Sequence, residues 1–96
     1  MGRAMREKPA RLGEKLLQIR LALGLSQNGI VERLGISETS YRHYISAFEN
    51  GQREPSLLVL LRYAQAANVW VDALIDDDLD LPPQLPSPKK SEGIKA

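Results

Sequence analysis

Cysteine is absent from this chain of 96 residues, and histidine occurs only once. The lack of cysteine excludes disulfides, thiolate metal sites and cysteine nucleophiles. One histidine cannot supply the three or four nitrogen or sulfur ligands of a zinc-type site, so we expect no metal and no cofactor. No apolar run approaches the roughly 20 residues that a membrane span needs. We therefore expect a cytoplasmic protein without membrane contact.

Patterns typical of catalytic sites are lacking as well. The sequence has no glycine-rich phosphate loop, no activated nucleophile and no spaced pair of acids, so we expect neither an enzyme nor a small-molecule site. Residues 76–80 include four aspartates, but the glycine and the closing glutamate of a calcium loop are missing. We interpret Asp76, Asp77, Asp78 and Asp80 as a solvated, acidic helix end.

The net charge is only +1, but its distribution is uneven. Residues 1–24 carry six basic and two acidic side chains, whereas residues 76–80 carry four acidic ones and no basic one. This pattern predicts a domain whose two ends are oppositely charged, with a basic end suited to phosphates. A solvated basic tail is the alternative interpretation.

Apolar residues recur at helical spacing along most of the chain, which predicts an all-α fold. We expect helices over about residues 11–23, 27–34, 40–49, 57–67 and 71–75. They form one domain over residues 11–78, preceded by a flexible basic arm at 1–10. Residues 79–96 are rich in proline and polar side chains, so we expect a disordered tail that adds little to the core.

Helix starts are indicated by serine and threonine. Ser26 and Ser56 are expected to cap the second and fourth helices, and Thr39 or Ser40 the third. Gly29 lies inside the second helix, where glycine is unfavourable, and we attribute it to the close approach of another helix.

Helical periodicity also assigns the buried faces. In the third helix, Tyr41, Ile45 and Phe48 face the core, and Glu49 lies near the edge of this face, where a carboxylate needs a partner. The outward residues of this helix are expected to be Ser40, His43, Ser46, Ala47 and Asn50, with Arg42 and Tyr44 at the edges. The fourth helix is expected to bury Leu57, Leu60, Leu61 and Ala64 and to expose Leu58 and Val59.

Five segments together resemble a known family. They are LGEKLLQIRLALGLSQ (12–27), ERLGIS (32–37), ISAFENG (45–51), REPSL (53–57) and LLRYAQAANV (60–69). In this order and spacing, the chain from residue 12 to residue 75 resembles the helix-turn-helix DNA-binding domains of the phage-repressor and Cro type, the XRE family. The resemblance implies a compact five-helix domain whose second and third helices form the helix-turn-helix, with the third helix in the major groove of double-stranded DNA.

The resemblance also implies roles for individual residues. Arg20 and Glu49 would form an ion pair that fixes the third helix. Gln27, Asn50 and Arg53 would lie near phosphates. Base contacts would map onto Arg42, His43 and Ala47, and Ser40, Tyr41, Tyr44 and Ser46 complete the expected DNA surface. Val69, Trp70 and Val71 would lie in a homodimer interface.

One departure from the family concerns the start of the third helix. The chain has about four residues more than is usual, within ISETSYR (36–42). About 3.6 residues make one turn, so the surplus either lengthens the connecting turn or adds a turn to the front of the third helix. The register of Ser40, Tyr41 and Arg42 depends on which of the two occurs.

The function that this resemblance implies is a sequence-specific transcriptional regulator, a repressor that binds DNA as a dimer. The alternative is a protein-interaction module, or an antitoxin-like protein that binds a partner, on the same fold. Charge supports the alternative, because residues 25–58 contain four glutamates and only three arginines.

Overall fold

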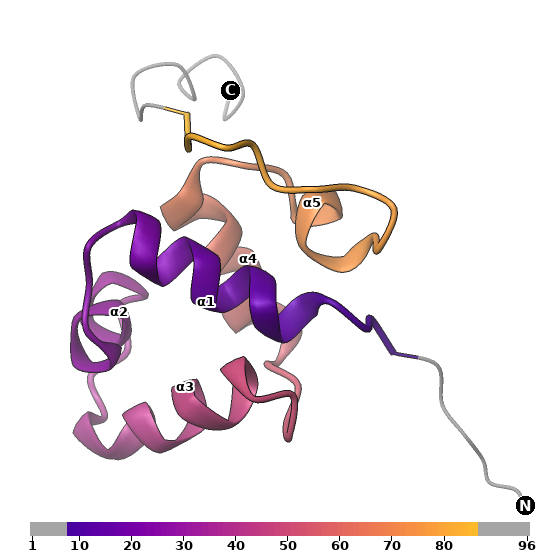
Figure 1. The fold of residues 1–96 in the computed structure, drawn as a ribbon. Helices are drawn as coiled ribbons and strands as arrows, with labels where there is room; N and C mark the ends of the chain where they lie inside the picture. The colour runs from indigo at the N-terminus through magenta and orange to yellow at the C-terminus, as the bar shows by residue number, and fades with distance from the viewer. Residues whose placement is uncertain (1–7, 87–96) are drawn as a thin grey trace, which may run out of the picture.

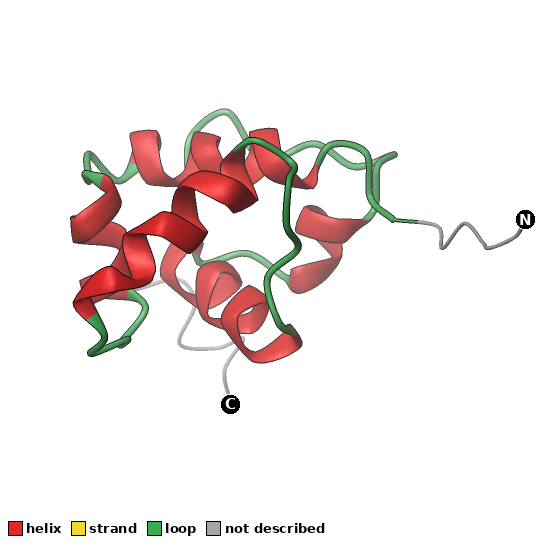
Figure 2. Ribbon diagram, turned by 90° about the horizontal axis from the view of Figure 1, so that it is seen from below, coloured by secondary structure: helices red, strands yellow, loops and turns green. Residues whose placement is uncertain are grey.

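A computed structural model of the chain describes residues 8–86. The helices are α1 (Leu12–Ala22), α2 (Gln27–Arg33), the 3₁₀ turn η1 (Thr39–Tyr41), α3 (Arg42–Glu49), α4 (Leu57–Ala67) and α5 (Val71–Ile75). No strand occurs among these residues, which confirms the all-α prediction (Figures 1 and 2). None of the described helices is long and apolar enough to cross a membrane.

Helix α1 is the central element, because it packs against α3, α4 and α5 (Figure 1). Its residues Leu16 and Ile19 are fully buried, in agreement with the helical spacing of apolar residues along the chain. They meet fully buried side chains from each of the other α-helices, namely Ile30, Ile45, Tyr63 and Leu74. Burial of each large apolar side chain contributes about 1.5–3 kcal/mol, so the domain is stabilised chiefly by contacts around α1.

Two of the three predicted helix caps are confirmed. The Ser26 hydroxyl accepts the Gly29 N–H at 2.9 Å, and the Ser56 hydroxyl accepts the Val59 N–H at 3.2 Å. The third prediction was wrong, because Thr39 and Ser40 lie inside η1, and neither η1 nor α3 has a side-chain cap. The surplus residues thus form a 3₁₀ turn that leads directly into α3, and this continuity replaces a cap.

The buried face of α4 is rotated relative to the prediction. Leu60 and Ala64 are buried as expected, but Leu57 is 86% exposed and Leu61 is 41% exposed. Val59 and Tyr63 are buried instead. The buried stripe of α4 therefore starts at Val59 and Leu60 and includes the fully buried ring of Tyr63, while Leu57 and Leu61 lie outside it.

A glycine allows α1 and α3 to pack closely, but it is Gly13 and not Gly29. A Cβ atom on Gly13 would lie only 2.8 Å from the Phe48 carbonyl oxygen and 3.0 Å from that of Glu49. At Gly29 the nearest atoms belong to Leu25 and Ser26 of its own turn, at 3.3 Å. The helix–helix approach expected at Gly29 therefore occurs at Gly13, against the end of α3.

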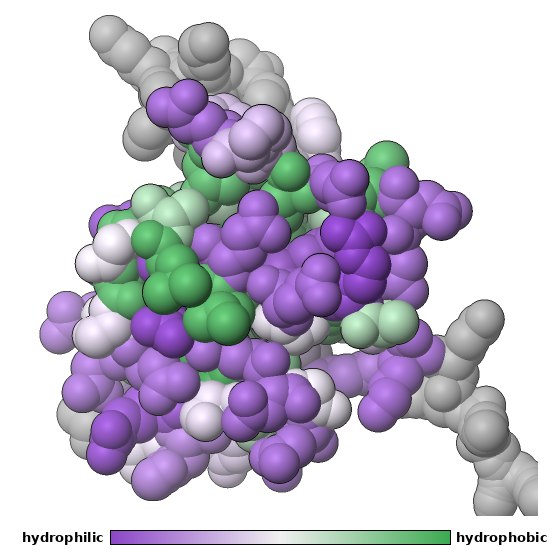
Figure 3. All heavy atoms as spheres, viewed as in Figure 1, coloured by the Kyte–Doolittle hydropathy of each residue, from purple (hydrophilic) through white to green (hydrophobic). Residues whose placement is uncertain are grey.

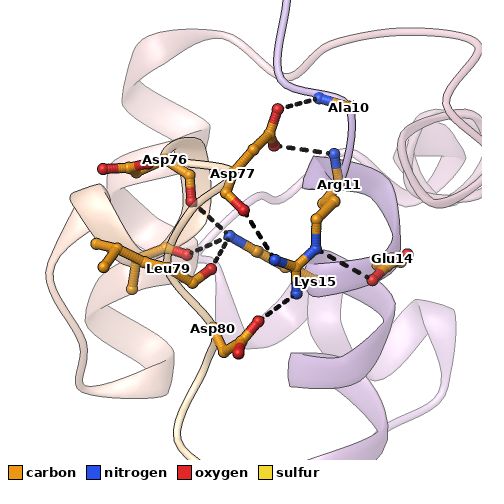
Figure 4. A network of polar contacts seen from close by, with 9 residues as sticks. Ala10, Arg11, Glu14, Lys15, Asp76, Asp77, Leu79 and Asp80 are labelled. Atoms are coloured by element: carbon orange, nitrogen blue, oxygen red, sulfur yellow. Dashed lines mark hydrogen bonds and ion pairs between the residues drawn. The ribbon is translucent and has the colours of Figure 1, made fainter.

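Residues 76–86 follow α5 and form a segment that we call the C-terminal strap. Its main contact is Lys15 of α1, whose side chain is fully buried. The Lys15 Nζ donates to the carbonyl oxygens of Ala73, Asp76 and Leu79 at 2.9, 2.9 and 2.7 Å (Figure 4). A buried ammonium is tolerable only with such partners, and here all three of its donors are used.

Aspartates of the strap also hold the start of α1. The Asp77 carboxylate accepts the N–H groups of Ala10 and Arg11 at 2.9 and 3.1 Å, and the Arg11 guanidinium pairs with Asp80 (Figure 4). Backbone N–H donors lower the pKa of Asp77, and the Arg11 side chain lowers that of Asp80. The basic start of α1 and the acidic residues are therefore neighbours, not opposite ends of the domain, and Asp77 and Asp80 are not simply solvated.

The strap also contributes to the core. Leu81 is buried and Leu85 packs against the core cluster, so the expectation that residues from 79 onward add little to the core fails for these two. The composition of the segment did not predict this packing, because two leucines are enough to attach a proline-rich segment to the core. The rest of the predicted tail, residues 87–96, and the predicted arm up to residue 7 lie outside the described residues.

Candidate nucleic-acid interface

The residues predicted to bind DNA lie in η1, in α3 and in the residues directly after it, except Gln27, which begins α2. Figure 1 places α3 on one side of α1, with α5 on the other, and hydrophilic residues gather over this lower part of the molecule in Figure 3. The exposed members of the predicted set are Ser40, Arg42, His43, Tyr44, Asn50 and Arg53. The partly buried members are Gln27, Tyr41, Ser46 and Ala47. Because Ile45 and Phe48 are buried beneath them, α3 presents one polar side to solvent.

A two-pronged ion pair anchors the C-terminal end of α3. The Arg20 Nε lies 2.7 Å from Glu49 Oε2, and the second contact, from Nη2 to Oε1, is 3.1 Å. The side chains of Arg20 and Glu49 are 14% and 6% exposed. The third contact of the guanidinium goes to the Leu25 carbonyl at 3.0 Å. Hydrogen bonding to Glu49 raises the pKa of Arg20 above its ordinary value.

Gln27 belongs to the same anchor. Its side-chain amide nitrogen lies 3.3 Å from Glu49 Oε1, within hydrogen-bond reach. The first residue of α2, the last residue of α3 and the last turn of α1 therefore meet at one carboxylate. This carboxylate fixes the two helices of the helix-turn-helix relative to α1, and it occupies a donor of the Gln27 amide, which the family resemblance places near phosphates.

The loop after α3 folds back onto the helix. The N–H groups of Gln52 and Arg53 point at the Ala47 carbonyl, at 2.9 and 3.3 Å, and Gly51 makes the reversal with a φ of +77°. The Arg53 guanidinium carbon consequently lies 4.7 Å from the centre of the Tyr44 ring. The sequence placed Tyr44 at the helix edge but gave no sign of this contact, because it depends on the path of the loop.

Charge on this side of the molecule is close to balanced. Of the four glutamates in residues 25–58, Glu49 is neutralised by Arg20 of α1. The other charged side chains of the segment are three glutamates and three arginines, namely Glu32, Glu38, Glu54, Arg33, Arg42 and Arg53. The apparent acidity of the segment therefore does not describe its surface.

The residues expected in a dimer interface lie at the junction of α4 and α5. Asn68 ends α4 in a left-handed conformation, with a φ of 64°, and turns the chain towards α5. Trp70 then occupies the position before α5 and is 64% exposed, whereas Val69 and Val71 are partly buried against the core. Of the three, Trp70 is the one whose large side chain is exposed.

Comparison with known proteins gives consistent matches. Residues 13–77 match the family described as "Helix-turn-helix domain". The structure of the restriction-modification controller protein C.AhdI from Aeromonas hydrophila is similar, with 32% identity and a TM-score of 0.56 over 68% of this chain and 92% of that one. The P22 c2 repressor, determined in complex with synthetic operator 9T, has 27% identity and a TM-score of 0.60 over 70% and 96% of the two chains. No curated protein matches the chain.

Proposed function

This chain belongs to the XRE-type helix-turn-helix family, and we propose that it is a sequence-specific DNA-binding transcriptional regulator, a repressor that acts as a cytoplasmic homodimer. Its fold is that of DNA-binding regulators. The proposal depends on how α3 is held in the domain. Its inner side is anchored through Ile45, Phe48 and Glu49, and its outer side presents polar side chains to solvent. We propose no catalytic step.

Helix α3 supplies the base contacts in this proposal. It begins at Arg42, and the N-terminal residues of a recognition helix contact base edges in the major groove. The Arg42 guanidinium suits guanine O6 and N7, His43 can donate or accept one hydrogen bond, and Ala47 can touch a thymine methyl group. Asn50 and Arg53, together with the start of α2 at Gln27, would contact phosphates and set the position on the duplex.

A selection of duplexes from a random library, followed by titration at two salt concentrations, tests this proposal. Arg53→Ala should weaken binding to all duplexes alike and lower the salt slope by about 1. Arg42→Ala or His43→Ala should instead change the preferred bases, at about 1–3 kcal/mol per lost contact. If the parent protein binds no duplex of the library at low salt, the proposal is wrong.

The proposed dimer forms around Trp70. Its exposed ring adjoins α4 and α5, which pack together and also expose Leu57, Leu58 and Ile75. Two recognition helices in such a dimer would meet half-sites about 34 Å apart, one turn of DNA. Sedimentation should show Trp70→Ala as a monomer at concentrations where the parent is dimeric. Leu21→Ala is the matched control, since Leu21 is 61% exposed on α1 and should not affect association. Equal association of all three proteins would exclude this interface.

A protein-interaction module, or an antitoxin-like partner-binding protein, is the second candidate. It is favoured by α3 having Arg42 as its one arginine or lysine and by the exposed leucines of α4. The titration separates the two candidates. A module that has lost DNA binding would show no sequence preference, and its Arg42→Ala variant would bind duplexes as the parent does.

A further inference from the structure

Three aromatic rings form a row along one flank of α3, which we call the aromatic row. Phe48 is almost fully buried and starts the row in the core. The Tyr41 ring packs edge-on against it with centroids 6.1 Å apart, and the Tyr44 ring is 4.9 Å from that of Tyr41. The Arg53 guanidinium lies over Tyr44 at 4.7 Å. The row therefore connects the hydrophobic core to an exposed arginine of the loop after α3.

The contact with Tyr44 restricts the Arg53 side chain, which is otherwise flexible. An arginine has many rotamers, and ordering it opposes any contact that it makes. A cation–π contact with an aromatic face holds the guanidinium close to the ring, while its N–H groups remain able to donate. A planar guanidinium held in this way suits the two-pronged recognition of a phosphate.

The surplus residues of the helix-turn-helix contribute to this arrangement. Tyr41 lies in η1, within the stretch 36–42 in which the family resemblance places the surplus residues. Its ring occupies the space between Phe48 and Tyr44. The surplus turn thus provides a support for Tyr44, which at 37% exposure has limited burial of its own.

We propose that Tyr44, supported by Tyr41, is a positioning residue that holds the Arg53 guanidinium ready for a DNA phosphate. Tyr44 acts through Arg53, not by reading a base. This inference rests on the proposed DNA-binding function. It explains how the Arg53 side chain is ordered before it contacts a phosphate.

A double-mutant cycle tests the coupling between these two residues. The probe is a labelled pool of random-sequence duplexes at low salt, because a phosphate contact does not depend on sequence. Tyr44→Leu should weaken binding of the parent about two- to fivefold, the range for an exposed cation–π contact. In an Arg53→Ala background the same change should have no measurable effect. Tyr44→Phe, which keeps the ring, should restore the coupling. Arg62→Ala on α4 controls for the loss of one positive charge.

A second measurement does not require DNA. The Nε–Hε signal of Arg53 in the free protein should be shifted upfield by the Tyr44 ring, and the shift should disappear in Tyr44→Leu but remain in Tyr44→Phe. Equal losses of affinity from Tyr44→Leu with and without Arg53, or an unshifted signal in the parent, would overturn the positioning role. If the parent does not bind the pool at all, the proposed function fails, and the phosphate role fails with it.

Discussion

Helix α1 holds two parts of the molecule by two different kinds of polar contact. Near its C-terminal end, Arg20 pairs with the carboxylate of Glu49 and fixes α3. Five residues earlier, Lys15 donates to three carbonyl oxygens and fixes α5 and the strap. The first contact joins two opposite charges, and the second joins one charge to neutral dipoles. The recognition side and the strap side of the domain are therefore both set relative to α1, but they should respond differently when a contact is removed.

The largest effect is expected at the ion pair. Glu49→Ala leaves the Arg20 guanidinium poorly exposed and without its carboxylate, which should lower the free energy of unfolding by about 3–5 kcal/mol. Chemical denaturation monitored by circular dichroism measures this loss. The double variant Arg20→Met, Glu49→Leu is the control, because removal of both charges should recover part of the stability. If the double variant is less stable than Glu49→Ala, desolvation of an unpaired charge is not the cause.

A smaller loss of stability is expected when Lys15 is changed. Lys15→Met keeps most of the side-chain volume and removes only the ammonium. The carbonyl groups of Ala73 and Leu79 then lose the Lys15 donor, whereas that of Asp76 keeps the Leu79 N–H. The free energy of unfolding should fall by about 1–3 kcal/mol, the usual cost of leaving a buried acceptor without its donor. Thermal denaturation measures the change, and Lys8→Met, on an exposed lysine, is the matched control. Unchanged stability of Lys15→Met would mean that Leu81, Leu85 and the contacts of Asp77 and Asp80 with the start of α1 hold the strap without the lysine.

The smallest effect is expected at Asp77, and it depends on pH. Backbone N–H groups hold the pKa of Asp77 below its ordinary value. The stability from these contacts is therefore present above the unfolded-state pKa of about 3.9, and it is lost as the pH falls through the lower folded-state pKa. Asp77→Asn should flatten the loss of stability between neutral and acidic pH. Asp72→Asn on α5 is the control, and an equal acid response of the parent and Asp77→Asn would contradict this assignment.

The sequence predicted those parts of the molecule that local chemistry determines. Helix bounds followed from apolar spacing, and Ser26 and Ser56 marked two starts because an N-cap involves only neighbouring residues. The Arg20–Glu49 pair was accessible through the family pattern, and Glu49 at the edge of an apolar face already required a donor.

The contacts that the sequence did not predict depend on backbone groups or loop paths that neighbouring residues do not determine. Lys15 shares the apolar face of Leu12, Leu16 and Ile19, and this was a usable sign that its ammonium needed buried partners. Those partners are carbonyl groups 58 to 64 residues away, and carbonyl groups have no sequence signature. The contact of Arg53 with Tyr44 likewise required the path of the loop after α3.

The central claim is that α3 binds DNA, and mapping the DNA contact by nuclear magnetic resonance tests it most directly. Amide signals of the chain would be followed as a duplex selected from the random library is added. Shifts should concentrate on α3, from Arg42 to Glu49, and on Gln27 and Arg53, while signals of the C-terminal strap stay in place. Shifts concentrated on α5 and the strap, with α3 unchanged, would contradict the account.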